Sequence, residues 1–305
     1  GHSGEISALV LSPDDQTFIT SGSDRTAKIW SFATGELLQT LKTGSHCGLK
    51  GLALTPSSLP LTLFTAGEEI GVWDGRSCRK VRSLKGEQQS YYSVAISADG
   101  QYLASGSFAY GIQIWDWQRG KLLLSFKHST DSGGKYSEVT ALAFSTHHRA
   151  LMSLDSVGRL RFWHFLTGEQ MSSPMAQHSI TKMAISPDAT VFAAASSQGI
   201  QIWDLVTDTK IHTLPPYRDR RNSSVGVRCL AFSPNNRLLA SGYYRTPTSA
   251  IDNNIKIWDI ASGQEQQSLP GHSLTVTGLA FSRNGQTLIS CSEDSSVRIW
   301  QTINA

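Results

Sequence analysis

Seven tryptophans recur along the chain at a nearly constant spacing, and each closes a short stretch of alternating apolar and polar residues. Successive members are 43, 42, 48, 40, 55 and 42 residues apart, at Trp30, Trp73, Trp115, Trp163, Trp203, Trp258 and Trp300. A repeat of about forty residues built from short strands and turns indicates a radial array of four-stranded sheets. We therefore predict an all-β, seven-bladed propeller of antiparallel four-stranded blades, with residues 1–305 forming one domain.

Strand and turn signals precede the tryptophan in each repeat. The apolar run Leu9–Leu11 enters the turn residues Ser12, Pro13 and Asp14, and the run Leu230–Phe232 enters a similar turn at Ser233. A second short strand follows and ends in small residues, as in Tyr102–Ser107. Turn residues between short apolar runs are typical of antiparallel strands joined by tight connections. Each repeat therefore predicts two strands, then the strand that bears the tryptophan, then an outer strand.

At these tryptophans the chain resembles the WD-repeat family of β-propellers. The Trp-Asp pair stands at Trp73, Trp115, Trp203 and Trp258, whereas Ser31, His164 and Gln301 follow the other three tryptophans. The turns and the Leu-Ala-Ser-Gly strands resemble the bacterial, and particularly the cyanobacterial, branch of the family. The resemblance covers essentially the whole chain. It implies a scaffold without cofactor or catalytic residues that binds a protein or peptide partner.

The two ends of the chain bear on how the ring closes. Only residues 301–305 follow Trp300, which leaves no room for a fourth strand in the last repeat. In closed propellers of this family that outer strand comes from residues upstream of the first Gly-His pair. We therefore expect the last blade to lack its outer strand and the chain to be the C-terminal part of a longer polypeptide. An alternative function follows, in which the propeller is the sensing or targeting domain of a signalling enzyme such as a bacterial serine/threonine protein kinase.

Two sets of polar residues admit either a catalytic or a structural interpretation. A hydroxyl, an imidazole and a carboxylate are the residue types of a nucleophile, its base and its orienting group. In the family, such residues together with the tryptophan form a buried hydrogen-bond network instead, and buried polar groups need such partners. We favour the network, which comprises His2, Thr20, Asp24 and Trp30 in the first blade and His272, Ser290, Asp294 and Trp300 in the last.

Composition excludes several other classes of function. The net charge of +3 is too small to indicate nucleic-acid binding, and no apolar stretch approaches the length of about 20 residues that spans a membrane. The nine histidines are scattered, whereas a zinc site needs three or four converging ligands. The four cysteines lie singly without Cys-x-x-Cys spacing, which favours reduced thiols and a cytoplasmic location. We expect no metal and no cofactor.

Inserted loops on one face of the ring predict the binding surface. They comprise residues 127–138, 215–226 and 243–254, and tyrosine and arginine concentrate in them. Both residue types dominate interface hot spots, and arginine clusters recognise acidic or phosphorylated peptides. The candidate binding residues are Tyr217, Arg218, Arg220, Arg221, Tyr243, Tyr244, Arg245, Tyr110 and Tyr136. A second basic run, including Arg79 and Lys80, is better explained as charge that protects an exposed strand edge.

Overall fold

The structure of the protein is a computed structural model that describes residues 1–44, 48–56, 60–86, 90–108, 111–127, 137–145, 149–173, 179–218, 222, 224–244 and 255–302. These residues form strands and turns, and none of them lies in a helix. Accordingly, none of the described segments is a helix that could cross a membrane.

The strands group into seven antiparallel sheets in chain order. The first three sheets contain β1 (Ile6–Leu11), β2 (Thr17–Gly22), β3 (Thr26–Ser31) and β4 (Leu37–Lys42); β5 (Gly51–Leu54), β6 (Thr62–Ala66), β7 (Ile70–Asp74) and β8 (Lys80–Leu84); and β9 (Tyr91–Ile96), β10 (Tyr102–Ser107), β11 (Ile112–Asp116) and β12 (Lys121–Phe126). The fourth and fifth contain β13 (Val139–Phe144), β14 (Ala150–Asp155), β15 (Leu160–His164) and β16 (Gln170–Met171); and β17 (Ile180–Ile185), β18 (Val191–Ser196), β19 (Gly199–Asp204) and β20 (Thr209–Leu214). The sixth contains β21 (Val227–Phe232), β22 (Leu238–Tyr243), β23 (Ile255–Asp259) and β24 (Glu265–Leu269), and the seventh contains β25 (Val276–Phe281), β26 (Thr287–Ser292) and β27 (Val297–Gln301).

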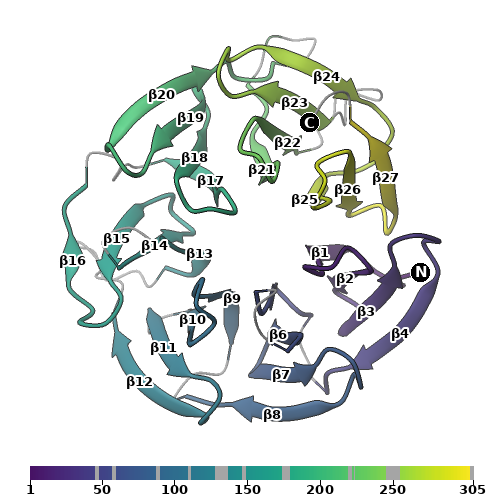
Figure 1. The fold of residues 1–305 in the computed structure, drawn as a ribbon, viewed down its shortest axis with the longest axis vertical. Helices are drawn as coiled ribbons and strands as arrows, with labels where there is room; N and C mark the ends of the chain where they lie inside the picture. The colour runs from purple at the N-terminus through teal and green to yellow at the C-terminus, as the bar shows by residue number, and fades with distance from the viewer. Residues whose placement is uncertain are drawn as a thin grey trace.

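The seven sheets form a closed ring, in which the first strand of each sheet lies near the axis and the fourth lies at the periphery (Figure 1). Three hydrogen bonds join the seventh sheet to the first. Thr277 Oγ1 donates to the carbonyl of Ile6 (2.7 Å), Ser295 Oγ donates to the carbonyl of Gly4 (2.9 Å), and the Arg283 amide donates to Asp15 (2.6 Å). The predicted seven-bladed propeller is confirmed, including the three-stranded last blade.

In six blades, a serine or threonine at the end of the first strand fixes the turn that follows. Ser12 Oγ accepts a hydrogen bond from the Thr17 amide (2.9 Å) and donates to Asp14 (2.7 Å). The same hydroxyl-to-amide bond recurs at Ser97, Ser186, Ser233, Ser282 and Thr55. These local bonds compete with continued strand pairing and bend the chain into a turn. The Ser-Pro-Asp pattern in the sequence therefore sets where first and second strands part.

Each tryptophan packs against the preceding blade. Trp73 lies in a buried cluster with Ile19 and Ile29 of the first blade, and Trp258 lies with Ile200 and Ile202 of the fifth. The indole NH meets a hydroxyl of the neighbouring second strand in six blades, at 2.7 to 3.1 Å. Large aromatic surface is thus buried while its one polar group stays satisfied. The tryptophan period is consequently the period of the contacts between blades.

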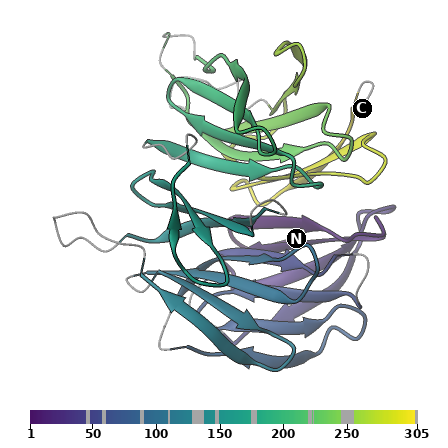
Figure 2. The same cartoon turned by 60° about the vertical axis from the view of Figure 1, so that its left-hand side comes forward.

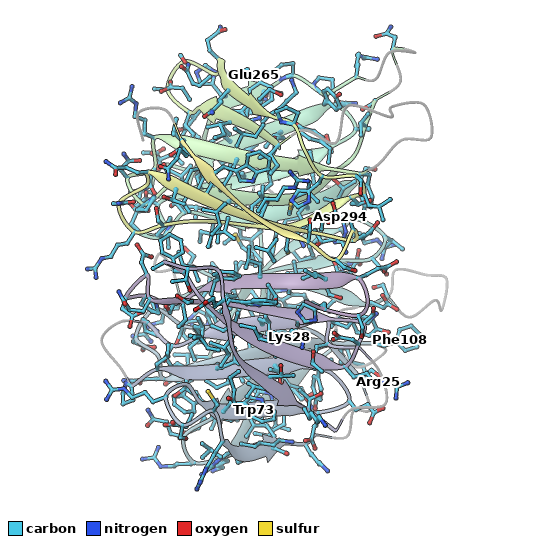
Figure 3. The ribbon with its side chains drawn as sticks, turned by 90° about the vertical axis from the view of Figure 1, so that its right-hand side faces the viewer. Arg25, Lys28, Trp73, Phe108, Glu265 and Asp294 are labelled. Atoms are coloured by element: carbon cyan, nitrogen blue, oxygen red, sulfur yellow. The ribbon has the colours of Figure 1, made fainter. Side chains whose placement is uncertain are left out.

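The two faces of the ring carry different connections. We call top the face that holds the connections from fourth to first strand and from second to third strand; Figure 2 shows how the turns gather at both ends of the sheets. Arg25, Phe108 and Asp294 follow second strands of three different blades, and all three lie on one side of the ring (Figure 3). The inserted segments 127–138, 215–226 and 243–254 belong to these connections. The described residues of these segments therefore lie in top-face connections.

Candidate interaction surface

In the first and last blades, buried hydrogen bonds connect the polar residues that admit a catalytic interpretation. His2 contacts Thr20 Oγ1 through Nε2 (2.7 Å) and Asp24 Oδ2 through Nδ1 (2.8 Å), while Trp30 Nε1 donates to Thr20 Oγ1 (2.8 Å). The last blade repeats the pattern, with the corresponding distances 2.7, 3.0 and 2.8 Å for His272 to Ser290, His272 to Asp294 and Trp300 to Ser290. A neutral imidazole protonated on Nδ1 satisfies every one of these contacts.

The electrostatics of both sets also fit a structural role. Burial lowers the pKa of His2 and of His272, which favours the neutral imidazole. Burial raises the pKa of Asp294, but hydrogen bonds from Ser296, from the Ser273 amide and from His272 outweigh it and lower the pKa to about 2. The hydroxyl-bearing residues Thr20 and Ser290 are 0% exposed, so a substrate cannot reach these oxygens. The two sets therefore tie top-face connections together.

Around the sixth blade, two predicted residues form an aromatic pair. The rings of Tyr217 and Tyr243 lie 4.9 Å apart between centroids. Tyr243 is only 1% exposed, its hydroxyl is hydrogen-bonded to Ser241 (2.9 Å), and its pKa is raised by burial. Tyr243 thus supports the partly exposed Tyr217 from inside the blade, and a ligand on this surface would contact Tyr217 rather than Tyr243.

Charged groups surround Tyr217 on the flank of the sixth blade. Lys256 Nζ lies 5.0 Å from the centroid of Tyr217 and 5.7 Å from that of Trp258, and it pairs with Glu265 at 2.5 Å. A hollow of 510 Å³ opens here, lined by Pro216, Arg218 and these residues. Arg218 is exposed, although its guanidinium donates to the carbonyl of Asn222 (2.9 Å). This flank combines aromatic surface with the exposed positive charge of Arg218.

The remaining described candidate, Tyr244, points the other way. Successive strand residues face opposite sides of a sheet, and Tyr244 follows the buried Tyr243 at the end of β22. Its ring is 45% exposed and lies under the guanidinium of Arg228, with 5.8 Å between the centroid and Cζ. The structure thus divides the predicted cluster between a flank at Tyr217 and Arg218 and an inner part at Tyr244. The other candidates, Arg220, Arg221, Arg245, Tyr110 and Tyr136, lie outside the described residues.

Two cations on first strands were not predicted from the sequence, namely Arg228 on β21 and Lys182 on β17. The sequence does contain a signal for them. When the seven first strands are aligned at their Ser or Thr turn residues, Lys182 is the only charged residue at its position. Both cations lie on strands, whereas the inserted length and the tyrosines and arginines that predicted the binding surface lie mostly in loops.

The basic run on the second blade is partly neutralised within the blade. Lys80 and Lys85 both pair with Glu69, the latter at 3.1 Å. Burial raises the pKa of Glu69, yet the hydrogen bonds from Lys80, Ser83 and Lys85 together lower it to about 2. This carboxylate therefore stays ionised and holds two of the cations at the outer edge of the blade.

Comparison with known proteins agrees with this architecture. The family described as "WD domain, G-beta repeat" matches residues 1–31, 78–116, 169–204, 210–259 and 263–301, and each matched segment ends one residue after a tryptophan. The chain belongs to this WD40 repeat family. Most of the second and fourth blades fall outside the matched segments, yet both form four-stranded sheets.

Individual relatives are distant in sequence. The chain is 23% identical over 98% of its length to autophagy-related protein 16 of Arabidopsis thaliana and 24% identical over 95% to apoptotic protease-activating factor 1 of Homo sapiens. It is 25% identical over 98% to the Denticleless protein homolog of Danio rerio. The chain spans 56%, 25% and 45% of these three relatives, respectively. All three come from eukaryotes, so the bacterial branch stays a prediction.

Proposed function

We propose that the protein is a non-catalytic interaction platform that binds an acidic or phosphorylated peptide segment of a partner protein on its top face at the sixth blade. A scaffold role is general for WD40 propellers, and the surface and ligand named here are the specific part of the proposal. The observation that supports it most is the exposed Tyr244 ring, over which the Arg228 guanidinium lies, at the start of an inserted loop. An aromatic face beside a planar donor fork suits carboxylate and phosphate groups.

Further residues on the flank support the same surface. Tyr217 and Arg218 follow the end of β20, beside the hollow of 510 Å³. A binding segment that contacts Tyr244 and Tyr217 would cross the top edge of the sixth blade, because the two rings lie on opposite sides of it. Tyrosine offers large contact area at small cost in side-chain entropy. We also propose a reducing, cytoplasmic setting, since the described cysteines Cys78, Cys229 and Cys291 are free thiols.

The experiment that tests the proposal compares two double variants in binding to an array of acidic, phosphorylated, neutral and basic peptides. Arg220→Ala with Arg221→Ala is expected to weaken binding of the acidic peptides and to flatten its salt dependence, because fewer ions are released or screened at the site. The control, Arg79→Ala with Lys80→Ala on the second blade, is expected to change little. The proposal fails if the second-blade pair matters and the sixth-blade pair does not.

We retain a second proposal for the longer protein, in which this propeller is the sensing or targeting part of a signalling enzyme. The observation behind it is that the three relatives extend well beyond the part to which the chain is similar. Kinase motifs elsewhere in the full-length polypeptide would support it. A parent polypeptide without any enzyme domain would refute it.

A further inference from the structure

Lys182 occupies a strand position where the other six blades carry a small side chain. The strand pairings define the position: Lys182 pairs with Ala195 just after the irregularity in β17, as Ala141 pairs with Leu154 and Cys229 with Gly242. The residues at this position in the other blades are Ala8, Gly51, Ser93, Ala141, Cys229 and Gly278. A long cationic side chain near the axis is therefore a departure from the repeat.

Lys182 does not make the bond between blades that other residues make from this position. In two other blades the side chain there bonds to the first carbonyl of the next blade's inner strand: Ser93 Oγ donates to Val139 (2.8 Å) and Cys229 Sγ donates to Val276 (3.2 Å). Lys182 makes no hydrogen bond or ion pair with any residue that the structure describes, and its side chain is partly exposed. The ammonium group thus has hydrogens available to a ligand.

Arg228 adds a second cation from the adjacent inner strand. In the fourth, fifth and seventh blades the corresponding residue is Thr140, Thr181 or Thr277, just before the small position. The Arg228 guanidinium lies over the Tyr244 ring. Like the charge of Lys182, its charge is not paired with a described carboxylate. Burial lowers the pKa of Lys182, and the charge of Arg228 lowers it further. Two like charges held partly out of water destabilise one another, and an anion between them would relieve both costs.

From this arrangement we infer that Lys182 and Arg228, whose guanidinium lies over the Tyr244 ring, form a site for one compact oxyanion at the inner strands of the fifth and sixth blades. The ligand is a phosphate or carboxylate group, which accepts hydrogen bonds from an ammonium and a guanidinium together. This inference deepens the proposed function, on which it rests for the source of the anion. It assigns acid recognition to two strand residues rather than to the loops alone.

The test uses inorganic phosphate as the probe, at an ionic strength matched with chloride. Phosphate is expected to raise the Tm of the protein, because a ligand that binds only the folded state stabilises it. Lys182→Ala, which restores the small residue of the other blades, is expected to weaken phosphate binding by about tenfold or more in calorimetric titrations. Without phosphate, the Tm of Lys182→Ala should equal or exceed that of the unmodified protein. A folding defect is therefore distinguishable from loss of the site. Arg228→Thr is expected to weaken binding similarly.

Lys50→Thr is the matched control, because Lys50 occupies in the second blade the position that Arg228 occupies in the sixth. It is expected to bind phosphate as the unmodified protein does. An equal loss in this control, or no phosphate response in the unmodified protein, overturns the inference.

Acetate in a parallel titration separates the two sources of the anion. A response to phosphate alone assigns a phosphorylated residue, and a response to both anions admits acidic side chains. If acidic peptides bind to Lys182→Ala as they bind to the unmodified protein, the inferred site is wrong and the proposed function stands. If phosphate binds as expected but no acidic peptide binds, the inferred site stands and the proposed function is wrong.

Discussion

At the scale of single residues, the propeller depends on giving each buried polar atom a partner. Six of the repeat tryptophans donate their indole hydrogen to a serine or threonine on the neighbouring strand. In the fifth blade Ala194 pairs with Gln201 where the other blades have the hydroxyl, and the buried Trp203 Nε1 has no acceptor within the described part of the chain. An unsatisfied buried donor costs roughly 1–3 kcal/mol.

Ala194→Ser is therefore expected to stabilise the protein by about 1 kcal/mol, because the new hydroxyl accepts the hydrogen of Trp203. Denaturant unfolding measures the change in the free energy of unfolding. Ala193→Ser is the control, since Ala193 is equally buried but pairs with Ile202 rather than facing the indole position. It should destabilise the protein. A free energy of unfolding that is unchanged or lower in Ala194→Ser would contradict this explanation of the tryptophan pattern.

The hydrogen-bonded carboxylate of the last blade predicts a pH dependence. The pKa of Asp294 is about 2 in the folded protein against an ordinary value of 3.8. Because folding lowers this pKa, the ionised carboxylate stabilises the fold above about pH 4, and that stabilisation is lost as the pH falls from about 4 toward 2. Asp294→Ala should cost on the order of 1–3 kcal/mol at neutral pH. Its Tm should converge with that of the unmodified protein in acid, and a constant difference across this range would argue against the linkage.

At the scale of strands and sheets, the last blade differs from the others in its exposed edge. β27 pairs with β26 on one side, and its residues are partly or fully exposed, including Ile299 at 45%. The fourth strands of other blades also expose apolar side chains, such as Leu38 on β4 and Val81 on β8, but on β8 the charged Lys80 and Arg82 flank Val81. An apolar, unpaired edge invites pairing with another chain.

Ile299→Lys is accordingly expected to reduce concentration-dependent self-association, which light scattering or sedimentation velocity would measure. The added charge opposes edge-to-edge pairing of β27 without entering the core. Val81→Lys serves as the control, because Val81 is also exposed but lies on a strand that already carries lysine and arginine. Self-association that is equal in both variants and in the unmodified protein would show that the β27 edge is not the contact.

At the scale of the whole molecule, the features that recur in every repeat could be predicted from the sequence. The side-chain contacts that form between neighbouring blades could not. The tryptophan period and the Ser-Pro-Asp turns act within one repeat, so sequence alone predicted seven blades and the missing last strand. Tyr243 was grouped with surface tyrosines, yet its ring is covered by the neighbouring blade. The site inferred at Lys182 and Arg228 depends on adjacent blades brought together around the axis, since the two residues are 46 positions apart in the chain. Such contacts follow from ring geometry, which spacing does not reveal residue by residue.

The most direct measurement of the central claim is a hydrogen–deuterium exchange footprint of the full chain with and without the tightest acidic peptide from the array. A platform that uses the top face at the sixth blade predicts slower exchange in residues 215–244, with the turns on the opposite face and the outer strand β8 unchanged. Protection confined to those opposite turns or to β8, with none in residues 215–244, would contradict the claim.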